Sequence, residues 1–523
     1  MGFVECLDSF PPSYVLRLTF SGLGPLAVRL LVANRGEIAV RIFRACRDLG
    51  IETVAVFSDA DRDAPHVAMA DYAVRIGPAP AVESYLSIPA ILDAARRTGT
   101  KLVHPGYGFL AENAAFARAC GDAGLVFVGP KPESIEAMGS KTGSRRLMEK
   151  AGVPVVPGML RPAADAAELK AFAKAAGYPI LLKASAGGGG TGMRRVDSDA
   201  DLEAAFARVS SEARSAFGDG AVYAEKLIER PRHVEVQVLG ESGGRVTALG
   251  ERECSIQRRH QKVVEECPSP AVGDALRGRL FDAAVAAAGA VDYVSCGTVE
   301  FLVAPDGAFY FLEMNTRLQV EHPVTEEVWG VDLAAAMIQI ALGGSAPFDA
   351  TAAAPRGHAI ECRIYAEDAR RGFAPAPGRI DVLRLPAGPG VRHDMGVEAG
   401  SIVPIDYDPM LGKLVVHGAD RGQARARLSR ALSEYEIVGV ETTLPLFRAL
   451  SEDPGFASAE FDVQWLERRL ADGLLAVDAE SDDSVLLAAL GLAGSNGATP
   501  AAGPTGSTRS LWGDVAKRES LRG

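Results

Sequence analysis

Two alternating hydrophobic patterns fill the first quarter of the chain. Short apolar runs, typical of buried strands, lie at 28–34, 52–58, 101–106 and 125–130. Apolar residues spaced three and four apart indicate amphipathic helices at 36–50, 90–99 and 116–124. Because the predicted strands alternate with helices, we predict a doubly wound parallel sheet over about 28–135.

Beyond Ser140 the pattern changes to longer β segments. Apolar and polar residues alternate at 233–240 and 246–257, which predicts two strands. A β-hairpin is predicted at 298–315, with its turn near Asp306. The chain is therefore expected to contain more than one packed unit, as its length of 523 residues also indicates.

Composition excludes several classes of protein. The chain carries 55 basic and 67 acidic side chains, and this net charge of -12 argues against a general nucleic-acid binder. No apolar run approaches the roughly 20 residues of a membrane span. Seven scattered cysteines without a CxxC pair predict reduced thiols. Residues 1–27 lack the basic region of a signal peptide, so we expect an unstructured extension and a cytoplasmic protein.

A glycine run follows a predicted strand at 179–183. Residues 187–190 are consecutive glycines, and each ordered glycine costs roughly 0.5–1 kcal/mol relative to alanine. One interpretation is a flap whose N–H groups close over phosphates, with Lys183 adding charge at its base. The other interpretation is a surface linker. The run matches neither the P-loop nor the dinucleotide fingerprint.

Two glutamates on opposite arms of the hairpin suggest a metal site. If the turn holds an even number of residues, Glu300 lies directly opposite Glu313. Like charges at such positions destabilise a hairpin unless a cation lies between them. Carboxylate oxygens suit Mg²⁺ that bridges nucleotide phosphates. A three-residue turn would instead place the two carboxylates on opposite faces of the hairpin.

The segment after the hairpin is polar at every second residue. Five side chains share one face if this segment is extended: Glu313, Asn315, Arg317, Gln319 and Glu321. A solvated edge strand gives the same alternation, although such a strand favours Lys, Thr and Ser. The alternative is a site in which Glu313 binds metal, Arg317 binds an anion and Glu321 acts as a base.

A basic run lies between predicted β segments. Four basic or titratable side chains fall within five positions: Arg258, Arg259, His260 and Lys262. A solvated surface and an anion-binding patch are both consistent with this run. Its place close to the predicted hairpin along the chain favours the anion-binding patch.

Eight sequence runs together resemble the biotin carboxylase family of the ATP-grasp superfamily. They are ANRGEIAVRI (33–42), HPGYGFLAEN (104–113), FVGP (127–130), HVEVQV (233–238), QRRHQKVVEE (257–266), EMNTRLQVEHPVTE (313–326), GHAIECRIYAED (357–368) and PGRI (377–380). The fifth run and the RLQVEHPVTE portion of the sixth are long and specific. The resemblance covers about residues 28–470.

The resemblance implies an α/β fold with a definite division of the chain. We expect an N-terminal doubly wound parallel sheet, an ATP-grasp domain with a mobile lid subdomain, and a C-terminal α+β domain. The expected bounds are 1–27 for the extension, 28–140, 141–355 with the lid at about 157–228, 356–470, and 471–523 for a linker or tail that could start a further domain.

The resemblance also implies a reaction. ATP phosphorylates bicarbonate to carboxyphosphate, which decomposes to CO₂ and phosphate, and N1 of biotin is carboxylated. This is the first half-reaction of an acyl-CoA carboxylase, whose final acceptor the sequence does not identify. The implied cofactors are ATP and Mg²⁺ or Mn²⁺. Biotin is expected as a carrier-bound substrate, because the chain contains no Ala-Met-Lys-Met run. The expected partners are a biotin carboxyl carrier, a carboxyltransferase and a second copy of the chain, with neither nucleic acid nor membrane.

The residues that match the family motifs take their expected roles from it. ATP would be bound by Lys141, Lys183, Gly188, Gly189, Gly190, Glu225, His233, Gln257, His260 and Leu302. Bicarbonate would be bound by Lys262, Arg317, Gln319 and Val320, and the metal by Glu300, Glu313 and Asn315. Glu321 would be the base that deprotonates bicarbonate, with Arg317, Arg363 and Lys262 also catalytic and Arg363 in contact with biotin.

Two residues depart from the family pattern, and two other functions remain open. Ala186 and Thr191 replace a glycine and a basic residue of the flap, which would reduce its flexibility and charge. One alternative is another ATP-grasp ligase, such as a domain that activates bicarbonate for ammonia. The other is a binding subunit with impaired catalysis. Bicarbonate-dependent ATP hydrolysis that biotin stimulates would exclude the first, and ATP binding without turnover would favour the second.

Overall fold

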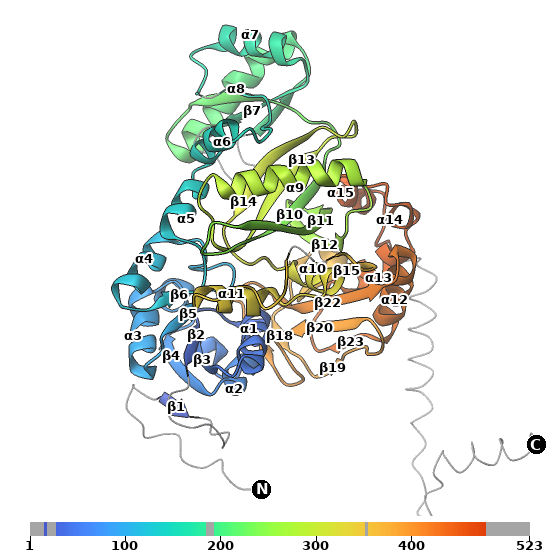
Figure 1. Cartoon of the computed structure of the whole chain (residues 1–523). Coiled ribbons are helices and arrows are strands. Elements are labelled where there is room, and N and C mark those ends of the chain that lie inside the picture. Colours follow the sequence, from blue (N-terminus) through green and yellow to red (C-terminus); the bar gives the residue numbers. More distant parts are fainter. Residues whose placement is uncertain (1–14, 18–27, 160, 185–192, 351–353, 477–523) are drawn as a thin grey trace, which may run out of the picture. The chain divides into compact units, whose positions relative to one another are not determined.

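The computed structural model describes residues 15–17, 28–159, 161–184, 193–350 and 354–476. Within these ranges the chain is a mixed α/β protein (Figure 1). No helix in this part of the chain combines the length and the apolar character that crossing a membrane requires. Three larger sheets organise the helices around them.

The first sheet contains six strands in the order β1-β4-β3-β2-β5-β6. In that order the strands span Val15–Arg17, Tyr72–Gly77, Glu52–Ser58, Arg29–Val32, Leu102–His104 and Val126–Phe127. The last five are parallel to one another. The connecting helices are α1 (Gly36–Asp48), α2 (Pro65–Met69), α3 (Ile88–Thr98) and α4 (Ala114–Asp122). The predicted doubly wound parallel sheet is confirmed, and its strand order reverses between β2 and β5, where ligands commonly bind.

The two strands at one edge of this sheet were not predicted. β4 follows α2, and β1 pairs with it antiparallel, with Val15 opposite Val74. The expectation of an unstructured extension before residue 28 is therefore wrong at residues 15–17. The free edge of β4 offers unpaired backbone groups that a short strand can satisfy, and local sequence patterns do not report such long-range pairing.

A separate three-stranded antiparallel sheet lies within the segment predicted as a lid. Its order is β8-β7-β9, with bounds Met193–Val196, Ile180–Ala184 and Val222–Lys226. Helices α7 (Ala166–Ala176) and α8 (Asp199–Phe217) pack on it through Leu169, Leu202 and Val209. The predicted strand at 179–183 is thereby confirmed. Residues Ala186 to Thr191, which include the glycine run, lie outside the described residues.

The largest sheet contains eight strands in the order β14-β13-β10-β11-β12-β15-β22-β20. In that order the strands span Phe309–Asn315, Ser295–Val303, Arg232–Gly240, Val246–Arg258, Gln261–Cys267, His358–Tyr365, Met410–Gly418 and Val391–Met395. All neighbours are antiparallel. β12 pairs with β15, so one sheet crosses the boundary expected at residue 355.

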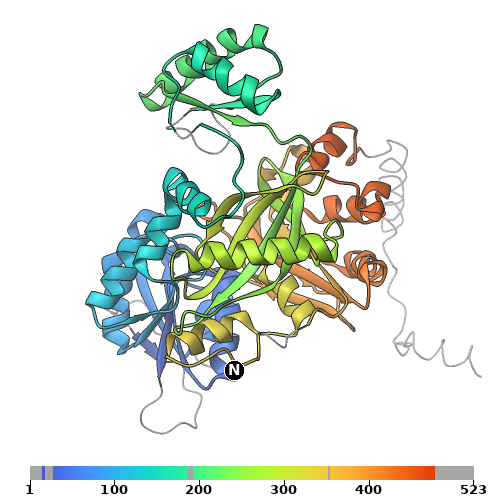
Figure 2. The same cartoon turned by 45° about the horizontal axis from the view of Figure 1, so that its top comes forward.

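The alternating sequence of β10 explains the two faces of this sheet. Its apolar residues share a core with α9 (Asp274–Gly289): Val234, Val236 and Val238. Figure 2 shows α9, in yellow-green, lying across these strands. The polar residues between them are also buried: His233, Glu235 and Gln237. The polar half of the alternation therefore marks a second packed face, because α10 (His322–Trp329) contacts β11, β12, β15 and β22.

The remaining elements surround these sheets. The other helices are α5 (Pro132–Gly139), α6 (Lys141–Lys150), α11 (Leu333–Ala341), α12 (Arg421–Glu434), α13 (Leu444–Glu452), α14 (Pro454–Ser458) and α15 (Trp465–Ala471), with 3-10 turns at Asp59–Asp61, Ala81–Glu83 and Ala369–Arg371. Three small strand pairs join β16 (Glu367–Asp368) to β17 (Ala374–Pro375), β18 (Gly378–Arg379) to β21 (Ile402–Val403), and β19 (Val382–Arg384) to β23 (Glu436–Val438). The six described cysteines are buried free thiols, which confirms the prediction of reduced cysteines for them.

Candidate active site

Lys262 lies at the centre of three buried carboxylates. Its ammonium on β12 is 2.5 Å from Glu235 on β10, 2.8 Å from Glu300 on β13 and 2.6 Å from Glu321 before α10. Burial lowers the pKa of Lys262, but the three carboxylates outweigh it and hold this pKa well above its ordinary value. Lys262 is therefore charged at neutral pH. Of the basic run found in the sequence, Lys262 is the member that enters this cluster, whereas Arg259 and His260 form the exposed two-residue turn between β11 and β12.

Glu300 and Glu313 are direct cross-strand partners, as predicted from the sequence. The turn between the strands, however, has an odd number of residues. Ala304 and Ala308 still pair, which leaves residues 305–307 as a three-residue loop. A β-bulge at Leu312 shifts the register between the Glu300 and Phe301 pairs and compensates for the odd turn. The prediction is confirmed, although the uniform register on which it rested is wrong.

The segment from Glu313 to Glu321 is not one extended chain. β14 ends at Asn315, the chain then bends, and Glu321 directly precedes α10. The single polar face predicted for this segment is therefore wrong, because the bend ends the two-residue period. Two of its side chains nevertheless meet at Glu300: the amide of Asn315 donates at 2.8 Å and that of Gln319 at 2.9 Å.

Glu321 has a second cationic partner besides Lys262. Arg363 on β15 lies 3.0 Å from Glu321 and 2.5 Å from Glu265. Burial raises the pKa of Glu321, but Lys262 and Arg363 outweigh it and hold this pKa well below its ordinary value. Burial, only partly offset by Arg363, raises the pKa of Glu265 to about 7. Arg363 was predicted from the sequence, whereas Glu265, which lies in the same run as Lys262, was not.

Arg317 is held by Glu112, which lies between β5 and α4. Its Nε donates to Glu112 at 3.0 Å and its Nη2 donates to Asn315 at 2.8 Å. The backbone N–H of Thr316 also donates to Glu112, at 3.1 Å. Glu112 was not assigned a role from the sequence, although it lies in one of the runs that carry the family resemblance.

His233 stands on the other side of Glu300. Its Nε2 is 3.0 Å from Glu300, and its Nδ1 is 2.9 Å from the amide of Gln257. Leu302 is the cross-strand partner of His233 on β13. Burial lowers the pKa of His233, but the charge of Glu300 outweighs it and leaves this pKa raised. Three of the residues expected to bind ATP therefore lie beside the Lys262 cluster.

A second group of charges lies on the three-stranded sheet. Glu225 on β9 forms ion pairs with Lys183 on β7 and, at 2.7 Å, with Arg145 on α6. Arg145 was not predicted from the sequence. Lys141 begins α6, and its side chain is outside the described part of the structure. The predicted residues Gly188, Gly189 and Gly190 lie wholly outside the described residues.

The chemistry of these residues fits a divalent cation. Glu300 and Glu313 supply the carboxylate oxygens that Mg²⁺ prefers. The packed surroundings and the nearby charge of Glu300 raise the pKa of Glu313, although its own side chain is exposed. A cation between them would relieve that repulsion. Asn315 fits less well as arranged here, because its oxygen accepts from Arg317 and its nitrogen donates to Glu300. His233, Glu235 and Glu300 also place ligand atoms close together.

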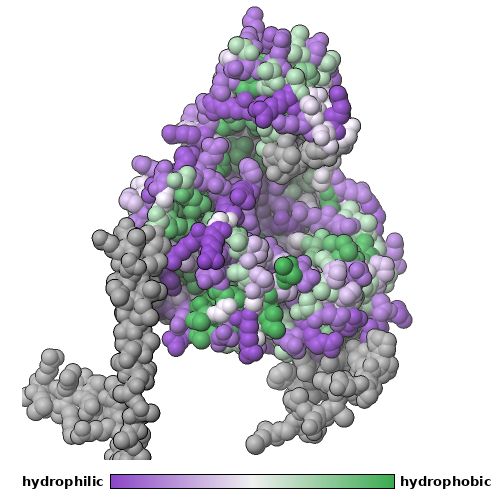
Figure 3. Space-filling view, turned by 180° about the vertical axis from the view of Figure 1, so that it is seen from behind, coloured by the Kyte–Doolittle hydropathy of each residue, from purple (hydrophilic) through white to green (hydrophobic). Residues whose placement is uncertain are grey.

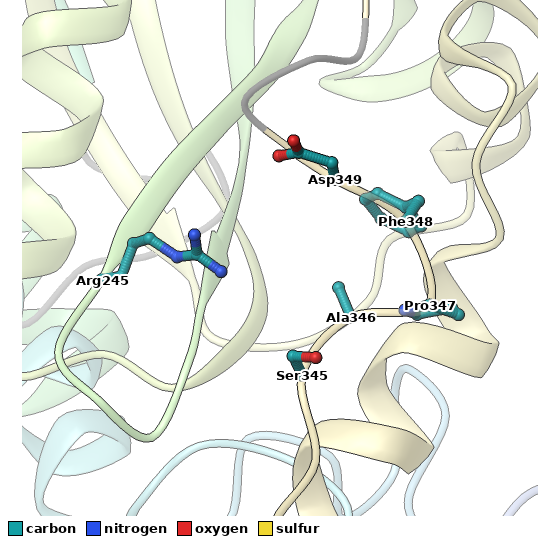
Figure 4. Close-up of a pocket in the computed structure, with 6 residues that line it drawn as sticks. All are labelled: Arg245, Ser345, Ala346, Pro347, Phe348 and Asp349. Carbon is teal, nitrogen blue, oxygen red and sulfur yellow. The ribbon is translucent and has the colours of Figure 1, made fainter.

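One surface pocket contains none of the residues that carry this chemistry. This pocket of about 470 Å³ is lined by Arg245 and residues 345–349, and Figure 4 shows Arg245 reaching toward that segment. Arg245 is already paired with Glu241. Hydrophilic residues predominate on the face in Figure 3. The buried charge cluster around Lys262, rather than a surface pocket, identifies the candidate site.

The combination of a doubly wound N-terminal sheet and this charge cluster is that of an ATP-dependent ligase, and comparisons agree. The model of the biotin carboxylase N-terminal domain matches residues 27–135, and that of the biotin carboxylase C-terminal domain matches 361–468. The model of the carbamoyl-phosphate synthase L chain ATP binding domain matches 140–347. The chain belongs to the biotin carboxylase family.

Individual relatives are similar over most of their length. Biotin carboxylase of Halalkalibacterium halodurans is 51% identical over 442 residues, which are 84% of this chain and 98% of the relative. A solved β-γ-ATP complex of biotin carboxylase from Campylobacter jejuni is 46% identical with a TM-score of 0.78, covering 84% of this chain and 98% of that one. The biotin carboxylase domain dimer of Hydrogenobacter thermophilus 2-oxoglutarate carboxylase, solved with MgADP, ADP and bicarbonate, is 45% identical with a TM-score of 0.77, covering 84% and 97%.

Proposed function

We propose that this chain is a biotin carboxylase that uses ATP and bicarbonate to carboxylate biotin at the cluster around Lys262. The observation that carries the proposal is the position of Lys262, whose ammonium contacts both Glu300 and Glu321. A fixed cation between a metal-binding carboxylate and a base is suited to neutralise a phosphorylated anion as it forms. The solved relatives with a β-γ-ATP and with MgADP and bicarbonate support these ligands.

Bicarbonate would be held by cationic and amide donors on the segment before α10. Arg317, the amide of Gln319, the backbone at Val320 and Lys262 form this proposed set. Glu321 would take the proton of bicarbonate, since its low pKa keeps it ionised at neutral pH. Its contacts with Lys262 and Arg363 would have to loosen for a substrate anion to take their place.

Arg363 is proposed to face biotin. Its guanidinium is buried between Glu265 and Glu321, and it would stabilise an enolate oxygen on the ureido ring. Arg317 would stabilise the anions beside it. Both arginines are always charged, so neither needs a proton change during the reaction.

ATP and a divalent cation are the proposed cofactors. Mg²⁺ or Mn²⁺ would be held by Glu300 and Glu313 with Asn315 nearby, and it would supply charge neutralisation to phosphate oxygens. The proposed ATP contacts are Lys141, Lys183, Gly188, Gly189, Gly190, Glu225, His233, Gln257, His260 and Leu302. Within this set Glu225 forms an ion pair with Lys183, and Arg145 is the second ion-pair partner of Glu225.

The domain bounds and partners are also proposals. The family models support a division near 28–140, 141–355 and 356–470. A lid at about 157–228 is proposed for the segment that holds the separate sheet β8-β7-β9. A carrier that bears biotin and a carboxyltransferase would act with this chain, since a relative from Methanothermobacter thermautotrophicus is named as one subunit of a pyruvate carboxylase. A homodimer is proposed because the Hydrogenobacter domain is described as a dimer. The buried free thiols agree with a reducing cytoplasm.

The test is ATP hydrolysis by the purified chain. We expect hydrolysis to require bicarbonate, to rise when free biotin is added, and to yield carboxybiotin. Glu321→Gln should abolish both the bicarbonate-dependent ATP hydrolysis and the formation of carboxybiotin, while ATP binding is retained. Stimulation by ammonia instead of biotin would show a different ATP-grasp ligase. ATP binding by the unchanged chain without any turnover would show a binding subunit.

A further inference from the structure

Arg252 lies beneath the candidate site with every one of its hydrogen-bond donors used. It is on β11 and is 0% exposed. Its five N–H groups meet five acceptors on separate residues: Nε donates to Glu235 at 2.6 Å, Nη1 to Gln237 at 2.8 Å and Thr325 at 2.9 Å, and Nη2 to Thr298 at 3.0 Å and Gln319 at 2.7 Å. A guanidinium has five donors in a fixed planar fork, so its position is fully determined.

One of these bonds fixes the direction of the Gln319 amide. Arginine can only donate, so the atom of Gln319 that meets Arg252 must be its oxygen. The amide nitrogen is therefore directed the other way, where it donates to Glu300 at 2.9 Å. A freely rotating glutamine would present oxygen and nitrogen alternately. With Arg252 in place, Gln319 offers an N–H₂ group, the end that attracts an anion.

A second bond reaches Lys262 through one carboxylate. Glu235 accepts from Arg252 on Oε1 and from Lys262 on Oε2. Because both oxygens are used, Glu235 cannot rotate without breaking one charge-assisted bond. Arg252 thereby sets the position of the Lys262 ammonium at one remove, through the carboxylate that the two cations share.

We propose that Arg252 is a positioning residue for bicarbonate, which orients the Gln319 amide directly and the Lys262 ammonium through Glu235. This inference rests on the proposed function, in which Gln319 and Lys262 hold the anion. Arg252 itself touches no substrate, since its donors are all occupied by the protein. Its loss should therefore weaken bicarbonate binding more than ATP binding.

The first test compares Arg252→Lys with Arg277→Lys in the full chain. Lysine keeps the charge but has three donors, so at least two of the five acceptors lose their bonds. Arg277 on α9 also pairs with a buried glutamate, Glu251, although Arg277 itself is only partly buried, and it serves as the control. Apparent KM values for bicarbonate and ATP, kcat and thermal unfolding are measured for both variants.

We expect Arg252→Lys to raise the KM for bicarbonate roughly tenfold or more, as loss of a charge-assisted bond allows. The KM for ATP should change less than about twofold, and Arg277→Lys should leave both constants near wild type. An unchanged KM for bicarbonate would overturn the proposal. So would a parallel rise of both KM values with a fall in thermal stability, because that would indicate a purely structural role.

Gln319→Ala separates this proposal from the proposed function. If Gln319→Ala leaves the KM for bicarbonate unchanged, the assignment of Gln319 to the anion fails, whatever Arg252 does. If both single variants raise it, the double variant should raise it less than the product of the two effects, because the residues act on one contact. If the KM for bicarbonate of the double variant rises by the full product of the two single effects, the claim that Arg252 acts directly on Gln319 is overturned.

A second pair of variants covers the case in which Arg252→Lys does not fold. Arg252→Gln combined with Glu235→Gln removes both charges of the buried pair, and Glu235→Gln alone is its reference. We expect the double variant to bind bicarbonate more weakly than Glu235→Gln. Equal KM values for bicarbonate in the two would overturn the proposal.

Discussion

Lys413 donates a hydrogen bond from its ammonium to the carbonyl oxygen of Val320 at 2.8 Å. Lys413 lies on β22 and is fully buried, and the same ammonium is 3.1 Å from Glu37 near the start of α1. Burial lowers the pKa of Lys413, but Glu37 and its other carboxylate neighbours raise it above the ordinary value. One charged group therefore ties the first helix and a late strand to the turn that carries Glu321.

Lys413→Met should destabilise the protein and disturb this turn. The change keeps the length of the side chain but leaves the buried Glu37 without its cationic partner, at an expected cost of about 3–5 kcal/mol, whereas Asp394 keeps its ion pair with Arg392. Urea denaturation measures the loss. Lys170→Met, which removes a surface pair with Glu203, is the control and should change stability by less than about 0.5 kcal/mol. Equal stability of the two variants would contradict the buried-charge argument.

Glu112→Gln tests whether Glu112 holds Arg317 in place. The amide oxygen can still accept from Thr316, while the charge opposite Arg317 is lost. Since Glu112 is partly exposed, we expect a loss of about 1 kcal/mol, a few-fold in kcat/KM. Glu136→Gln removes the charge of a surface pair with Arg118 and should leave kcat/KM unchanged. A similar loss in both variants would show that Glu112 has no special link to the site.

Lys262→Gln should remove nearly all activity. Glutamine can donate to one or two of the carboxylates but cannot offset the charge of Glu235, Glu300 and Glu321. We expect kcat to fall by about 10²–10³, the usual effect of losing a donor aimed at a developing charge. Circular dichroism and thermal unfolding check that the variant is folded. Activity within tenfold of wild type would place the reaction elsewhere.

His104→Asn should reduce the loss of stability in acid. His104 is buried beside Gly106, whose N–H it accepts, and burial lowers its pKa to about 3. Below the ordinary histidine pKa of about 6.5 the unfolded chain binds a proton and the folded chain does not, so stability falls as pH falls. At pH 5.5 this term is about 1.4 kcal/mol.

Asparagine retains an acceptor at the position of Nδ1 but does not titrate. The difference in urea stability between pH 7.5 and pH 5.5 should therefore be smaller in His104→Asn by about 1.4 kcal/mol. Part of the pH dependence of stability should remain in the variant. The pKa of His66 is lowered to about 4 and that of His322 to about 3, both by burial, so these histidines also destabilise the fold in acid. An identical pH dependence in the variant and the wild type would refute the role of His104.

The sequence predicted the cross-strand pair of Glu300 and Glu313, but for an incomplete reason. A loop length cannot be read from the residue pattern alone, and neither can a bulge such as Leu312. Here two departures from regular pairing, the odd turn and the extra residue, cancel one another. The alternation of β10 likewise predicted a strand, but it did not show that its polar side would be buried in the site, where Glu235 meets Arg252 and Lys262.

Three of the residues that were not predicted from the sequence share one physical property. Glu112, Arg145 and Arg252 act through partners far along the chain, and their value depends on which acceptors the fold brings to them. Arg252 lies in a strand of alternating residues, and nothing in the sequence around it distinguishes it from any other charged residue. The two-residue period of the sequence predicts the strand and the face on which a side chain lies. The partners of that side chain are set by how the elements pack.

The pairing of β12 with β15 decides how this chain can be divided. A fragment that ends before β15 would expose a long strand edge, a recognised route to aggregation. It would also deprive Glu265 of Arg363, and Glu266 of His358 and Arg421. The parts are thus not interchangeable modules joined at residue 355. A chimera that takes its C-terminal portion from a relative would need His358, Arg363 and Arg421 to match Glu265 and Glu266. The eight-stranded sheet and its ion pairs would therefore have to be exchanged as one piece.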